Sequence, residues 1–277
     1  MRGDVPDGLL YLPRLPRPMR TAFGNGGNGG ELSCAQVRDR RILAHVVPRY
    51  LPYTVKGGAS DGGLTDVSDV WDALVRLDAS EEAPEKAPGG RIIRLIYSGY
   101  ELDPGARDHE YRAGWTREHI WPRSHGGFDV HRPGIGTDLH NLFAADASVN
   151  SARSDRDFDD GGEPVVDPTP APGCDGHLRC RAGDGAWEPP DESKGVVARA
   201  AMYMACMYGG PPWNLRLVER RTGRGESCLG RLSALRAWAA ARPPSARELR
   251  RNDMVERWQG NRNPFVDDPT LAERTRF

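Results

Sequence analysis

The sequence predicts an α+β fold in which helices flank a small twisted sheet. One observation behind this prediction is a stripe of apolar residues at helical spacing within residues 64–77. A second is a run of branched apolar residues in residues 91–98, which is typical of a strand. A third is a pair of apolar helical segments, residues 196–208 and 229–241, each followed by Gly or Pro residues that end a helix. The sequence has no internal repeat, and we expect a single domain.

The beginning of the chain, residues 1–33, is predicted to be a flexible segment. Residues 24–30 consist only of Gly and Asn, which is the composition of a linker. The domain is therefore expected to extend over residues 34–277. A stretch rich in Pro, Gly and Asp, residues 159–191, is expected to be an insertion loop within it.

The C-terminal part of the chain has its own helix signal. Ser245 followed by Glu248 is a capping-box pattern, which predicts a helix that extends to about Trp258. Residues 260–264 then read as a turn that could return the chain toward the middle segments.

Two middle segments carry polar residues that could belong to a site. Asp138–Leu142 alternates polar and apolar residues, which predicts a strand. Ala144–Arg153 contains good helix formers, with Asp146 as a candidate N-cap. Asn150 then lies in the middle of a helix, where asparagine is unfavourable. A bond from its amide oxygen to a metal would compensate, and a solvent-facing asparagine is the alternative.

An acid and an imidazole are adjacent at Glu118 and His119. Neighbouring side chains of an extended segment point to opposite faces, so the two could share a site only where a bend turns them together. A neutral imidazole can take a proton from water, and a carboxylate suits Mg²⁺, Mn²⁺ or Ca²⁺. Alone, such a dipeptide is far more often a surface ion pair or a buried histidine than part of a site.

The combination of these segments in one chain resembles the endonuclease I family of nonspecific DNA and RNA nucleases, whose catalytic unit is a ββα-metal finger. The family motif is matched by Thr116–Ser124, Asp138–Leu142 and Ser148–Arg153, and by the distant segment Gln259–Phe265. The chain departs from the family pattern at Thr116, where many relatives have Asn, and at Asp268, where many have His.

The resemblance implies a role for each matched residue. His119 falls on the general base, and Glu118 and Asn150 fall on the ligands of a single divalent ion, Mg²⁺ or else Mn²⁺ or Ca²⁺. Arg153 and Arg262 fall among the catalytic residues as groups that grip phosphate, because a guanidinium matches two phosphate oxygens.

Four further residues are weaker candidates from the same resemblance. His140 and Asn141 would orient the base or metal-bound water. Arg117 and Arg123 are candidates for phosphate binding.

The implied function is a nonspecific endonuclease that hydrolyses phosphodiester bonds in DNA and RNA with a divalent metal, leaving 5′-phosphate and 3′-hydroxyl ends. We expect a monomer whose partner is its nucleic-acid substrate. A nucleic-acid-binding protein of the same fold with weak catalysis is the alternative. A zinc hydrolase is disfavoured, because His119 and His125 lack the i, i+4 spacing of a helical zinc pair.

The overall charge weighs against strong, salt-driven binding to DNA. The 277 residues include 38 Lys and Arg against 39 Asp and Glu, with an estimated pI of 6.7, whereas nucleic-acid enzymes are usually basic. Residues 213–262 hold twelve Arg against five acids, which could form a basic face or simply solvated helix faces. No stretch approaches the ~20 apolar residues of a membrane span.

The five cysteines do not settle the redox compartment. Cys174 and Cys180 are close enough in sequence to close the insertion loop with a disulfide, and Cys206 lies in an apolar helix as a core thiol. Residues 1–6 lack a secretory apolar region, so the sequence predicts no compartment, although members of the resembled family are often secreted or periplasmic.

Overall fold

A computed structural model describes residues 30–43, 46–55, 67–80, 92–107, 114–170 and 175–277. Contacts divide the chain into one unit from Met1 to Glu31 and a second from Leu32 to Phe277. Almost all of the first unit, and with it most of the predicted flexible segment, lies outside the described residues. Leu32 and Ser33, placed at the end of that segment by the sequence prediction, instead form a strand of the second unit.

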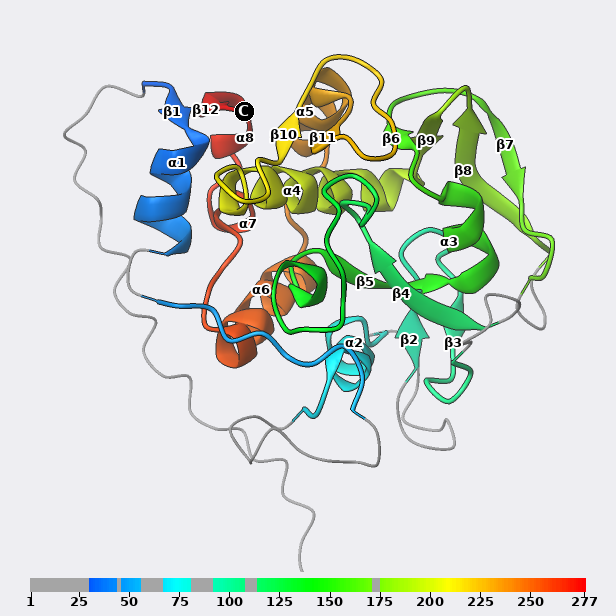
Figure 1. Ribbon diagram of the computed structural model, residues 1–277. Helices are drawn as coiled ribbons and strands as arrows, with labels where there is room; N and C mark the ends of the chain where they lie inside the picture. The colour runs from blue at the N-terminus through cyan, green and yellow to red at the C-terminus, as the bar shows by residue number, and fades with distance from the viewer. Residues whose placement is uncertain (1–29, 44–45, 56–66, 81–91, 108–113, 171–174) are drawn as a thin grey trace, which may run out of the picture. The chain divides into compact units, whose positions relative to one another are not determined.

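The second unit contains helices and short strands in mixed order, which confirms the α+β prediction (Figure 1). The α-helices are α1 (Cys34–Val37), α2 (Val70–Leu77), α3 (Ala147–Arg153), α4 (Asp191–Met207), α5 (Leu232–Ala241), α6 (Ala246–Gln259), α7 (Pro264–Asp267) and α8 (Leu271–Arg274). A π-helical turn, Arg38–Ile42, continues α1, and a 3₁₀ turn spans Ile135–Thr137.

The strands pair mostly in twos. They are β1 (Leu32–Ser33), β2 (Ile93–Arg94), β3 (Glu101–Leu102), β4 (Trp115–His119), β5 (Leu142–Asp146), β6 (Asp157–Phe158), β7 (Glu163–Val166), β8 (His177–Gly183), β9 (Ala186–Glu188), β10 (Arg216–Leu217), β11 (Cys228–Leu229) and β12 (Thr275–Arg276). The two-stranded sheets are β1–β12, β10–β11, β2–β3 and β4–β5.

The segment predicted as an insertion loop, residues 159–191, contains three strands among its described residues. Its strands β7, β8 and β9 join β6 in the order β6-β9-β8-β7. In β8 the exposed residues His177, Arg179 and Arg181 alternate with buried Leu178 and Cys180, the period of a strand with one buried face. Cys180 is a buried free thiol, and its predicted partner Cys174 lies outside the described residues.

Helix α4 is the centre of the larger hydrophobic core. All of its residues from Val197 to Cys206 are buried. Helix α5 packs along it, as the adjacent helices in Figure 1 show. A helix that is apolar nearly all round is expected to be enclosed by the rest of the fold, and this part of α4 is enclosed in that way.

The sequence-predicted helices are confirmed with shifted ends. Within the predicted 64–77 helix, Asp69 caps α2 by accepting a hydrogen bond from the Asp72 backbone, and residues 64–66 lie outside the described residues. Ser245 caps α6 by accepting from the Glu248 backbone. The predicted strand at 91–98 is shorter, since only Ile93–Arg94 is a strand.

The predicted strand over Asp138–Leu142 is wrong for its first four residues, which form a turn before β5 begins at Leu142. The fully buried carboxylate of Asp138 is the reason. Its Oδ1 accepts hydrogen bonds from the His140 backbone and from the Gln259 amide, each at 2.9 Å. Its Oδ2 accepts from the hydroxyls of Tyr203 at 2.9 Å and Tyr208 at 2.8 Å. A buried carboxylate needs such donors. The turn supplies the His140 backbone N–H, and it places the carboxylate within reach of the three side chains from remote segments.

Among the helices that the structure describes, none is long and apolar enough to cross a membrane.

Candidate active site

The strand pair β4–β5 and helix α3 hold the acid, the imidazole and the helix asparagine of the sequence prediction. The antiparallel register pairs Glu118 with Phe143 and His119 with Leu142. Helix α3 follows β5 directly and packs on both strands. Asp146 caps α3 by accepting from the backbones of Ser148 and Val149, which confirms the predicted cap.

An open cleft of about 460 Å³ lies along this unit. It brings together Glu118, His119 and Asn150 with the predicted arginines Arg117, Arg123 and Arg153. The other lining residues are Tyr53, Pro122, Ser124, Ser151, Ser154, Asp155 and Arg224. The adjacent Glu118 and His119 therefore reach one cleft from a regular strand, without the bend that the sequence seemed to require.

Glu118 is buried, and one of its two oxygens is held by the protein. Its Oε1 accepts hydrogen bonds from the Tyr97 hydroxyl at 2.7 Å and from Nη1 of Arg153 at 3.1 Å. In the part of the chain that the structure describes, no side chain donates a hydrogen bond to its Oε2, while the His119 backbone N–H also acts on the carboxylate. Burial raises the pKa of Glu118 above its usual value, while Arg153 and Tyr97 act in the opposite direction.

Asn150 is half-buried on α3 and lines the same cleft. Within the described residues its side-chain amide makes no hydrogen bond, although its backbone carbonyl accepts from Ser154 in the ordinary way of a helix end. The amide oxygen is therefore left for a ligand or for water.

The surroundings of His119 determine which ring nitrogen is basic. Its Nε2 lies 2.8 Å from the carbonyl oxygen of Gly136, a group that can only accept. Nε2 therefore carries the hydrogen, and Nδ1 is the free proton acceptor. The pKa of His119 is lowered to about 3, mainly by burial and also by the nearby arginines, against the opposing effect of the Gly136 hydrogen bond. The imidazole is neutral at pH 7 and able to accept a proton.

The Gly136 carbonyl that orients His119 reaches its position because the backbone at Gly136 lies very close to the backbone at Asp129. A Cβ atom at Gly136 would lie 1.9 Å from the carbonyl oxygen of Asp129, so no other residue fits there. The sequence showed only a Gly in a loop, and its role as the partner of His119 needed the structure.

Arg153 is too deeply buried to grip a substrate phosphate. Its side chain is 1% exposed, and besides Glu118 it donates to the carbonyl oxygens of His119 at 3.1 Å and Ile120 at 2.8 Å. Its guanidinium also lies 4.6 Å from the centre of the Phe158 ring. Arg153 thus neutralises the buried Glu118 and holds the end of β4.

Arg117 is likewise engaged within the protein. Its guanidinium lies between the rings of Tyr53 and Trp71, with centroid distances of 3.3 and 4.1 Å, and it donates to Thr54 at 2.9 Å. It holds Tyr53 beside His119, where the two ring centres are 5.9 Å apart. Arg123, by contrast, is exposed at the cleft.

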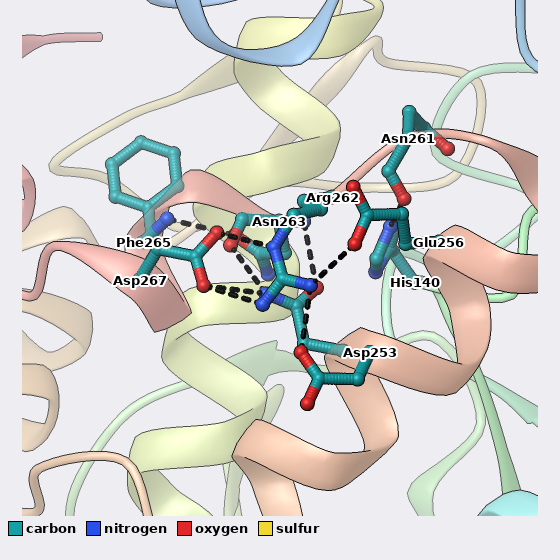
Figure 2. A network of polar contacts seen from close by, with 9 residues as sticks. His140, Asp253, Glu256, Asn261, Arg262, Asn263, Phe265 and Asp267 are labelled. Carbon is teal, nitrogen blue, oxygen red and sulfur yellow. Dashed lines mark hydrogen bonds and ion pairs between the residues drawn. The ribbon is translucent and has the colours of Figure 1, made fainter. Parts of the chain in front are cut away.

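The structure does not bring Arg262 to this cleft, contrary to the expectation that the C-terminal turn returns it there. Figure 2 shows its guanidinium among three carboxylates. It donates to Asp253 and Glu256 at 2.7 Å each, and to both oxygens of Asp267 at 2.7 and 2.8 Å. These contacts join α6 to α7, because a guanidinium satisfies several carboxylates at once.

His140 and Asn141 lie in the turn behind the cleft and do not line it. Nε2 of His140 is 3.1 Å from the carbonyl oxygen of Asn261, which ties the turn to the C-terminal segment. The Asn141 amide accepts from the Trp121 backbone at 2.7 Å and donates to the Trp121 carbonyl at 3.3 Å, which holds the residues just after β4.

Sequence reasoning missed several residues of the site. Tyr97, assigned to a strand, is the partner of Glu118. Arg224 reaches the cleft from a loop far along the chain, where its side chain is 78% exposed and 3.2 Å from Asp155. Asp155 in turn accepts from the Ser124 hydroxyl at 3.0 Å. The basic composition of residues 213–262 was the only signal for Arg224.

The donor set at the cleft fits a hard divalent cation. A free carboxylate oxygen and a free amide oxygen are ligands of the type that Mg²⁺ accepts, with its remaining positions filled by water and substrate oxygens. Within the described residues no group of three or more His, Cys, Asp or Glu side chains could hold a metal, so a site here would be only partly made of protein ligands.

A buried carboxylate, a neutral imidazole and a half-buried amide line one cleft beside exposed arginines in an α+β fold, a set of groups typical of an enzyme that acts on an anionic substrate. Comparison with known proteins identifies the family. The sequence pattern of Endonuclease I matches residues 65–270. The extracellular ribonuclease of Bacillus amyloliquefaciens is 39% identical over 209 residues, which are 74% of this chain and 66% of that protein.

Two further relatives agree. The extracellular ribonuclease of Bacillus subtilis strain 168 is 38% identical over 213 residues, 76% of this chain and 68% of that protein. The extracellular deoxyribonuclease of Aeromonas hydrophila is 29% identical over 136 residues, 47% of this chain and 48% of that protein. The chain thus spans about two thirds of the length of the two Bacillus proteins. It belongs to the endonuclease I family, a family of nucleases, which confirms the resemblance found in the sequence.

Proposed function

We propose that this protein is a divalent-metal-dependent nonspecific endonuclease that hydrolyses phosphodiester bonds in both DNA and RNA. The observation that carries the proposal is the meeting of Glu118, His119 and Asn150 in one cleft of an endonuclease I family chain. The strand pair β4–β5 with α3 would then be the ββα-metal finger. Relatives named as a ribonuclease and as a deoxyribonuclease support activity on both nucleic acids.

In this proposal His119 is the general base. Its Nδ1 takes a proton from a water molecule, which attacks the phosphorus in line. The hydrogen bond from Nε2 to Gly136 keeps the ring in the required tautomer and orientation, and the Tyr53 and Phe128 rings flank it. The attacking group is water, so the 2′-hydroxyl of RNA takes no part. Cleavage leaves 5′-phosphate and 3′-hydroxyl ends.

Glu118 and Asn150 would hold the single cation, Mg²⁺ or else Mn²⁺ or Ca²⁺, through Oε2 and the amide oxygen. When bound, such an ion supplies positive charge that offsets the charge developing on the phosphate and the departing 3′ oxygen. Tyr97 and Arg153 fix the carboxylate by its other oxygen. His140 and Asn141 position the turn and the end of β4 and do not touch substrate.

The exposed arginines Arg123 and Arg224 are proposed to bind substrate phosphates. Arg224 pairs with Asp155 at the cleft, and a phosphate could replace that exposed and therefore weak ion pair. We expect Arg224→Ala to raise KM for plasmid DNA roughly 3–10-fold with little change in kcat, and to reduce the salt dependence of KM.

The matched control for this change is Arg220→Ala. Arg220 lies on the same loop, is 58% exposed and pairs with Glu226, and does not line the cleft. Equal KM values for the two variants would show that Arg224 has no part in substrate binding.

The function itself is tested with purified protein on supercoiled plasmid and on single-stranded RNA, with Mg²⁺ and with excess EDTA. We expect both substrates to be cut with Mg²⁺ and neither with EDTA. Phosphatase treatment of the products should release phosphate from 5′ ends. Nucleic-acid binding without metal-stimulated cleavage would instead support a binding protein of the same fold.

A further inference from the structure

Two cysteines far apart in the chain meet at the edge of the main core. Cys34 is the first residue of α1, and Cys206 lies in the last turn of α4. Both are free thiols, and their Sγ atoms are 2.6 Å apart across a sequence separation of 172 residues. That separation is shorter than non-bonded sulfur atoms adopt, and the two side chains point at each other.

The fold holds both cysteines at this place through contacts other than sulfur. Ser33 caps α1 in a full capping box with Gln36, and Leu32 and Ser33 pair with Thr275 and Arg276 in the β1–β12 sheet. Helix α1 packs against α4, as the blue helix beside the end of α4 in Figure 1 shows. Oxidation would therefore need no rearrangement of the elements that carry the two thiols.

We propose that Cys34 and Cys206 form a disulfide when the folded protein meets a disulfide oxidant. Cys34 is only partly buried, whereas Cys206 is 1% exposed. The thiolate of Cys34 attacks one sulfur of an oxidant such as oxidised glutathione, and one glutathione thiolate leaves. Cys206 then attacks Cys34 Sγ in the mixed disulfide and displaces the second glutathione. Two protons are lost from the cysteines, and one oxidant molecule is reduced to two thiols.

The order of attack follows from burial. Burial raises the pKa of Cys206 well above its usual value, so Cys206 is a poor first nucleophile and acts as the resolving thiol within the pair. The bond would attach the first helix of the unit to its central helix. By closing a long loop, it would restrict the unfolded chain and stabilise the fold.

The five cysteines lie in five separate tryptic peptides, so the masses of disulfide-linked peptides identify which two cysteines are paired. Cys34 falls in residues 21–38 and Cys206 in residues 200–216. The other three fall in residues 157–179, 180–181 and 225–231. The full chain is incubated with oxidised glutathione or with dithiothreitol, free thiols are alkylated, and non-reduced digests are analysed by mass spectrometry.

We expect a linked peptide of residues 21–38 and 200–216 in the oxidised sample only, and a melting temperature higher by roughly 5–10 °C than in the reduced sample. The Cys206→Ser variant should lose both the link and the shift. Cys228→Ser, which removes another partly buried cysteine, should keep both.

The proposal is overturned if Cys34 remains alkylated after oxidation, or if it links to another cysteine. It is also overturned if the link forms equally in protein unfolded with guanidinium, because the fold would then play no part in the pairing. None of these measurements depends on nuclease activity, so their outcome is independent of the proposed function.

Discussion

Replacing His119 by Ala is expected to lower the rate of plasmid cleavage in Mg²⁺ by a factor of about 10²–10⁴, the usual contribution of a general base. The ring is a neutral proton acceptor at the cleft, and its tautomer is set because Nε2 is hydrogen-bonded to Gly136 at 2.8 Å. Without it the attacking water keeps its proton until late in the reaction. Initial rates at saturating substrate, normalised to the folded fraction from circular dichroism, measure the effect.

A matched control separates base chemistry from the loss of a buried histidine. His125 is 1% exposed and contacts Thr222 through Nδ1 at 3.3 Å, but it does not line the cleft. His125→Gln should leave kcat within about twofold, since it removes no group placed at the cleft. Added imidazole should partly restore the cleavage activity of His119→Ala, because the removed ring leaves space for it beside Gly136. Cleavage by His119→Ala at the wild-type rate would refute the base assignment.

Replacing Glu118 by Gln is expected to lower cleavage by a factor on the order of 10²–10³, and to raise the Mg²⁺ concentration needed for half-maximal activity. A ligated cation contributes several kcal/mol of charge stabilisation, and each 1.36 kcal/mol is a tenfold change in rate. The same change leaves the buried Arg153 without its counter-charge. The free energy of unfolding should therefore fall by up to roughly 3–5 kcal/mol, the range for breaking a buried ion pair.

The loss of stability and the loss of catalysis can be told apart with the ion pair between Arg199 and Glu248. Its atoms are 2.6 Å apart and its side chains are 2% and 7% exposed, but neither residue lines the cleft. Glu248→Gln should destabilise the fold to a similar degree, measured by urea unfolding. It should leave the rate per folded molecule and the Mg²⁺ dependence unchanged. A Mg²⁺ titration of Glu118→Gln that matches the wild type would rule out Glu118 as a ligand.

Several features of the fold could be predicted from local sequence signals. The apolar stripe of α2, the capping serine of α6 and the aspartate cap of α3 depend on neighbours within one or two turns, so the pattern was sufficient. For the segment Asp138–Asn141 the local pattern gave a wrong prediction. Its polar and apolar alternation suggested a strand, whereas the side-chain donors that satisfy Asp138 come from α4, from the residue just after α4 and from the end of α6. Those donors are remote in sequence, so the spacing of polar and apolar residues within the segment cannot predict them.

The arginines also show that the sequence supplies candidates and that tertiary contacts decide among them. From the sequence, Arg153 and Arg262 were the main candidates for gripping phosphate, and Arg117 and Arg123 were weaker candidates for phosphate binding. The structure turns Arg117 onto aromatic rings, buries Arg153 against Glu118 and surrounds Arg262 with three carboxylates. Arg123 remains exposed at the cleft, and Arg224 joins it from a distant loop. Which guanidinium is free for phosphate depends on partners contributed by other elements, and the spacing of residues along the chain does not specify those partners.

By itself the sequence determined the α+β class, the main helices and the family, and it named the acid, the imidazole and the helix amide as candidates for the site, because these follow from residue type and short-range order. Only the tertiary structure decided that adjacent Glu118 and His119 open onto one cleft, that Gly136 sets the tautomer of His119, and which arginines reach solvent there. Each of these depends on side chains and carbonyl groups that lie far apart in the chain and meet only after packing, where burial and a single hydrogen bond change what the same residue can do.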